Sequence, residues 1–84
     1  MPQGSIDREG AYIDISVPVE FAQAVLDRIL DCHKGISFDP HNSYADNSVH
    51  HLRLILKVAK RAEAFQLVKD IAKELGVSVI DKTG

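Results

Sequence analysis

The segment over residues 49–58 alternates apolar with polar side chains, and this period of two constrains the fold more than any other feature of the chain. Leu52 and Leu54 fall on one face of an extended strand, whereas His51 and Arg53 fall on the other. Successive side chains of a strand point to opposite faces. We therefore predict a strand over residues 49–58, apolar enough on one side to lie in the middle of a sheet.

Two other stretches repeat apolar residues every three or four positions, as amphipathic helices do. The first begins at Pro18, a residue favoured at the first helical position, and ends near Gly35. The second ends at Gly76, a residue common just after a helix. Together with the shorter extended stretches, these patterns predict strands over 12–17, 36–39, 49–58 and 77–80, and helices over 18–34 and 60–75.

The remaining residues are predicted to be irregular. Residues 1–10 are polar and lack periodicity, which indicates a flexible leader before a single domain over 11–84. Pro40 is expected to end the second strand, because proline cannot donate a hydrogen bond to a ladder. Residues 41–48 are rich in Asn, Ser and Asp, as a hairpin loop is.

The order β-α-β-β-α-β has a well-known solution. Crossovers between parallel strands are almost always right-handed, so both helices fall on the same side of the sheet. We therefore expect an α+β fold, a two-layer sandwich in which two helices cover one face of a four-stranded antiparallel sheet. This is the ferredoxin-like arrangement, with strands 12–17 and 49–58 in the centre.

Within that fold, the chain resembles the ACT-like group of regulatory domains. The resemblance is one of pattern over about residues 12–80, carried by the helix 61–75, the segment 76–80 that follows it, and the Lys34-Gly35-Ile36 junction. It implies a regulatory domain that pairs into dimers. ACT domains usually place a glycine between the first strand and the first helix, whereas this chain has Val17-Pro18-Val19 there. The resemblance therefore implies no ligand-binding residues in this chain.

Charge and cysteine content exclude several classes. The formal net charge is -2, whereas a generic nucleic-acid binder carries a basic excess. Cys32 is the single cysteine and cannot form an internal disulfide, which favours a reducing compartment. Neither an apolar signal core nor a stretch long enough to span a membrane is present. We expect a cytoplasmic protein that uses neither a membrane nor a cofactor.

Side chains that could bind a metal or take part in catalysis do not form a recognised motif. Four histidines lie within nineteen residues, but their spacing matches no known metal site: His33, His41, His50 and His51. His50 and His51 are adjacent and would point to opposite faces of a strand. Phosphate-binding loops, nucleophile elbows and paired catalytic carboxylates are absent from the sequence. We therefore predict neither a metal site nor catalytic residues.

The sheet face opposite the helices is the predicted working surface. It should expose a tyrosine and an isoleucine beside charged residues, a mixture that suits a protein partner. The predicted partner-binding residues are Tyr12, Asp14, His51, Arg53, Ile55 and Lys57. RNA-recognition domains carry aromatic residues on both central strands of this face, and here only Tyr12 is aromatic.

These observations favour a non-enzymatic binding or regulatory module that acts through protein–protein contacts and associates with itself as a homodimer. The alternative is a small inhibitor of a host protein machine, of the type that phages and plasmids encode. Metal binding and RNA binding rank below both.

Overall fold

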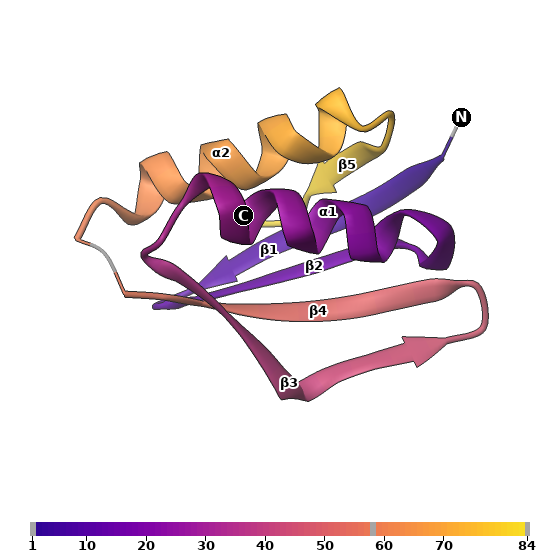
Figure 1. Ribbon diagram of the computed structural model, residues 1–84, viewed down its shortest axis with the longest axis horizontal. Coiled ribbons are helices and arrows are strands. Elements are labelled where there is room, and N and C mark those ends of the chain that lie inside the picture. Colours follow the sequence, from indigo (N-terminus) through magenta and orange to yellow (C-terminus); the bar gives the residue numbers. More distant parts are fainter. Residues whose placement is uncertain (1, 58, 84) are drawn as a thin grey trace.

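The computed structural model describes residues 2–57 and 59–83 of the 84-residue chain. It contains two layers, a sheet and a pair of helices that both lie on one face of the sheet (Figure 1). The expected α+β class is confirmed. In chain order the elements are β1 (Gln3–Glu9), β2 (Tyr12–Pro18), α1 (Val19–Cys32), β3 (Ile36–Asp46), β4 (Val49–Leu56), α2 (Arg61–Glu74) and β5 (Ser78–Asp81).

The sheet differs from the four-stranded antiparallel sheet that we expected. It has five strands in the order β3-β4-β2-β1-β5, and β2 and β4 occupy the central region as predicted. β1 lies between β2 and β5, antiparallel to the former and parallel to the latter. The sheet is therefore mixed, and the last strand pairs with the first instead of with β2.

The predicted flexible leader is wrong, because residues 3–9 form β1. The side chain of Ile6 is fully buried in this strand. Gly10 has a φ of 60°, a conformation that glycine adopts easily, and it allows the tight turn into β2. Gly4 lies so close to the carbonyl oxygen of Ser16 that a Cβ atom would collide with it. The strand went unrecognised because Ile6 is its only large apolar residue.

β3 also extends beyond the predicted strand 36–39, through Pro40 and most of the expected loop 41–48, to Asp46. Pro40 is tolerated because β3 is an edge strand, and the register with β4 shifts between Asp39 and Tyr44. The hairpin closes in a short turn at Asn47, which has a φ of 55°. Val58, the predicted end of the next strand, lies outside the described residues.

The core lies between the sheet and the helices. β2 and β4 contribute buried side chains at alternate positions, among them Ile15 and Leu54. Each helix contributes one stripe, of which Ile29 on α1 and Val68 on α2 are fully buried. Pro18 ends β2 and caps α1, and the first helical N–H, that of Val19, donates to the carbonyl oxygen of Ser48 at 2.8 Å.

Candidate functional site

The face of the sheet opposite the helices carries no covering element in the part of the chain that the structure describes (Figure 1), and we call it the open face. Strand register arranges its side chains in three rows that cross the sheet. They are Tyr44-His51-Ser16-Ser5-Ile80, Asp39-Arg53-Asp14-Asp7 and Ser37-Ile55-Tyr12-Glu9. Three large side chains with apolar surface remain exposed on this face: Tyr12 (42%), Tyr44 (59%) and Ile80 (57%).

The middle row is organised by Arg53. Its guanidinium donates two hydrogen bonds to the carboxylate of Asp14, from Nε at 2.8 Å and from Nη2 at 3.1 Å. The same group lies 5.1 Å from the ring centre of Tyr12, within range of a cation–π contact. The hydrogen bond to Asp14 and the charge of that carboxylate raise the pKa of Arg53 above its usual value. Arg53 is therefore held in one orientation beside an exposed aromatic ring.

A second cluster occupies the neighbouring row. The Ser16 hydroxyl and His51 Nδ1 are 2.7 Å apart, and the ring of His51 stacks on that of Tyr44 with centroids 4.6 Å apart. These residues, with Asn42 and Arg53, line a polar hollow of about 230 Å³ on the open face. Within the described residues no side chain hydrogen bonds to His51 Nε2. The arrangement therefore orients the imidazole ring but does not form a catalytic triad, in which the base needs an orienting group.

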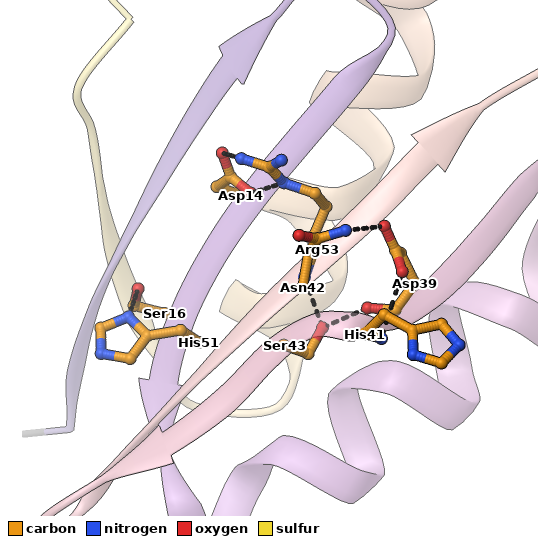
Figure 2. Close-up of polar contacts among 8 residues, drawn as sticks. All are labelled: Asp14, Ser16, Asp39, His41, Asn42, Ser43, His51 and Arg53. Atoms are coloured by element: carbon orange, nitrogen blue, oxygen red, sulfur yellow. Dashed lines mark hydrogen bonds and ion pairs between the residues drawn. The ribbon is translucent and has the colours of Figure 1, made fainter.

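The irregular part of β3 is held in place by Asp39 (Figure 2). Its carboxylate accepts hydrogen bonds from the Asn42 side chain at 2.6 Å and from the backbone N–H of His41 at 3.2 Å. Ser43 donates its hydroxyl proton to the Asp39 carbonyl oxygen at 2.7 Å and accepts from the Arg53 N–H at 3.0 Å. These bonds replace the backbone hydrogen bonds between β3 and β4 where the register shifts. Regular pairing of the two strands resumes at Tyr44.

Five of the six predicted partner-binding residues come together on the open face: Tyr12, Asp14, His51, Arg53 and Ile55. Lys57 is exposed but follows the end of β4, outside the three rows. Tyr44 was missed because it lies in the segment that we assigned to a loop. The sequence does contain one indication of the longer strand, the Asn47-Ser48 pair between two extended stretches. Short hairpin turns favour residues that tolerate positive φ, as Asn47 does here.

The open face is acidic. Its rows contain four carboxylates, those of Asp7, Glu9, Asp14 and Asp39, against the single guanidinium of Arg53. This charge opposes contact with a nucleic-acid backbone, whose binding depends on cations that neutralise phosphates. A surface of this charge is better suited to a protein with basic groups, or to a second copy that offers Arg53 to these carboxylates.

The histidines are dispersed over the fold. His33 accepts a hydrogen bond from the N–H of Gly35 at the end of α1, and His41 lies in the irregular part of β3. His50 pairs in register with Val17, and His51 pairs with Ser16, so the two rings point to opposite faces. In residues 2–57 and 59–83, His, Cys, Asp and Glu side chains form no group of three suited to hold a metal ion.

Comparisons with protein-family models, with curated proteins and with solved structures found no match to this chain. Over the described residues, the structure has no helix with both the length and the apolar character required to span a membrane.

Proposed function

We propose that this chain is a non-enzymatic binding or regulatory module that acts through protein–protein contacts, and that its open face is the surface on which two copies associate. The observation that carries the proposal is the ordered Tyr12–Arg53–Asp14 cluster on an uncovered sheet. Tyrosine and arginine supply much of the binding energy at protein interfaces. Because Asp14 already fixes Arg53, binding orders fewer side-chain rotamers and costs less entropy.

Charge distribution supports association with a second copy. Asp7 and Glu9 lie on β1, on one side of β2, whereas Arg53 lies on β4, on the other side. A two-fold axis along β2 would place β1 of each copy against β4 of the other, and would bring carboxylates against Arg53. Such an interface is isologous, as in most homodimers. A cytoplasmic setting belongs to the same proposal, since the chain has one cysteine and no disulfide.

Analytical ultracentrifugation of three proteins tests the proposal. The wild-type chain should sediment as a dimer, and a Tyr12→Ala/Arg53→Ala variant should associate at least roughly fivefold more weakly. Arg61→Ala is the matched control, because it removes an exposed cation at the start of α2 and leaves the open face intact. A dimer that survives the double substitution, with an unchanged melting temperature, would contradict the proposed interface.

A monomeric wild-type chain would favour the alternative, an inhibitor whose open face contacts a foreign protein. In that case the double variant should lose a partner that the wild-type chain and Arg61→Ala both retain in pull-downs from the native host. Loss of the partner with Arg61→Ala instead would place the contact on α2.

A further inference from the structure

A groove lies between α2 and β5, the strand at one edge of the sheet. The hollow on the open face lies toward the other edge, beside β3 and β4. The volume of the groove is about 440 Å³, and one wall consists of Gln66, Lys69, Asp70 and Lys73, which form a stripe along α2. The other wall is the backbone and side chains of residues 76–79. β5 is the last strand of the sheet, so this wall is an open sheet edge.

The outer edge of β5 offers unused backbone hydrogen-bonding groups. The N–H of Ser78 donates to the Pro2 carbonyl oxygen at 3.0 Å, and that of Lys82 donates to the Ile6 carbonyl oxygen at 2.8 Å. Residues that bond to β1 alternate with residues that point away from it. The peptide groups of Val79 and Asp81 therefore face outward, and β5 pairs with no strand other than β1 among the described residues. An added strand would find donors and acceptors here.

The opposite edge of the sheet is protected. Pro40 lies within β3, and the strand loses its register with β4 between Asp39 and Tyr44. Proline and irregular backbone are the features by which edge strands avoid pairing with other chains. The sheet is therefore open to extension on the β5 side.

The wall formed by α2 carries two lysines, Lys69 and Lys73, against one carboxylate, that of Asp70. Lys69 Nζ lies 3.4 Å from the Asp81 carboxylate, and Lys73 forms no ion pair within the described residues. Asp70 accepts a hydrogen bond from the Gln66 side chain at 2.9 Å. The two lysines are one helical turn apart, about 6 Å along the axis. Alternate residues of a strand repeat at about 6.6 Å, so two acidic residues at positions i and i+2 match this spacing.

We propose that the groove between α2 and β5 binds an extended acidic segment of a partner protein, which adds to β5 as a further strand. Residues at i and i+2 of the segment point toward Lys69 and Lys73, and the residues between them lie on the open-face side near Ile80. Main-chain hydrogen bonds supply the affinity of such β-augmentation, and side chains at alternate positions supply the specificity. The groove contains no residue of the Tyr12–Arg53–Asp14 cluster, on which the proposed self-association depends.

Two synthetic heptapeptides test the proposal on the full chain by NMR titration and fluorescence anisotropy. One alternates glutamate with valine, and the other alternates lysine with valine. The glutamate peptide should bind at least tenfold more tightly, and should shift the amide signals of Val79 and Asp81. Lys73→Glu should weaken its binding at least fivefold, whereas Lys34→Glu, which changes an exposed lysine outside both the groove and the open face, should leave it unchanged.

Backbone methylation of the glutamate peptide separates strand addition from simple charge attraction. Methylation of one alternate set of amides should abolish binding, and methylation of the other set should leave it intact, because only one set faces β5. Equal affinity of the two peptides, no binding at millimolar concentration, or insensitivity to both methylated sets would overturn the proposal. Binding that is lost in Tyr12→Ala/Arg53→Ala but retained in Lys73→Glu would also overturn it, since the peptide would then occupy the open face.

Discussion

The guanidinium of Arg53 holds the carboxylate of Asp14 through two parallel hydrogen bonds, from adjacent central strands of the sheet. A bidentate contact of this kind fixes direction as well as distance. We therefore expect the Nε–H signal of Arg53 to be resolved and slow to exchange in NMR spectra, and to be lost in Asp14→Asn. Asp31→Asn is the matched control, because it removes an exposed carboxylate on α1, away from Arg53 and from the open face. A signal that persists in Asp14→Asn would contradict the fixed geometry.

Ile6 tests whether β1 belongs to the folded domain. Ile6→Ala should lower the free energy of unfolding by roughly 2–5 kcal/mol, as large-to-small changes in cores do, and Leu54→Ala on β4 should do the same. Urea titrations monitored by circular dichroism measure both. Ile80→Ala, at an exposed position, should change stability by less than about 0.5 kcal/mol. If Ile6→Ala matched Ile80→Ala, β1 would not be a part of the core.

Gly4 tests the close approach of β1 to β2. A methyl group at this position would collide with the carbonyl oxygen of Ser16, which is backbone and cannot rotate away. We expect Gly4→Ala to cost roughly 1–3 kcal/mol of stability, in the range of overpacking substitutions. The neighbouring Ser5→Ala should be nearly neutral in the same thermal melts, since it removes a hydroxyl from the open face. Equal stability of the two variants would mean that the strands separate at no cost.

The lowered pKa of Asp81 predicts that the stability of the fold depends on pH. The hydrogen bond from the backbone N–H of Thr83, assisted by Lys69, lowers the pKa of Asp81 below its usual value of 3.8. The ionised carboxylate therefore contributes stability above pH 3.8, and this contribution is lost as the pH falls through the lower folded-state pKa. Wild type should be more stable than Asp81→Asn at neutral pH, and the difference should shrink in acid. A difference that grows on acidification would reverse the sign of this linkage.

Metal removal should not affect the fold. The histidines lie on separate elements, and His50 and His51 point to opposite faces of β4. We expect thermal melts in the presence and in the absence of a chelator to superimpose. A drop of many degrees on chelation would show that a metal ion stabilises the folded chain.

An element could be predicted from the sequence where its apolar residues repeat with a clear period. β2 and β4 alternate several buried residues with polar ones, and both helices repeat apolar residues over fourteen residues, so these elements were predictable. β1 was not, because a strand with one buried side chain lacks a detectable period. The position of β5 could not be predicted without β1, since its pairing depends on that strand.

The candidate site, too, could be predicted only in part. The Tyr12–Arg53 neighbourhood followed from alternation along two well-marked strands. The Tyr44–His51 stack did not, because Tyr44 reaches the open face only after the register shift that Asp39 and Ser43 stabilise. Hydrogen bonds of single side chains to the backbone leave no periodic pattern in a sequence.

The parallel pairing of β1 with β5 has a consequence for how the chain folds. It joins residues separated by most of the chain length, since Ser78 donates to Pro2 and Thr83 accepts from the N–H of Arg8. Contacts between such distant residues form slowly, because the intervening chain must first be ordered. Until β5 reaches its place, the outer edge of β1 remains unpaired. A folding intermediate that lacks this strand therefore exposes an edge that can pair with another chain.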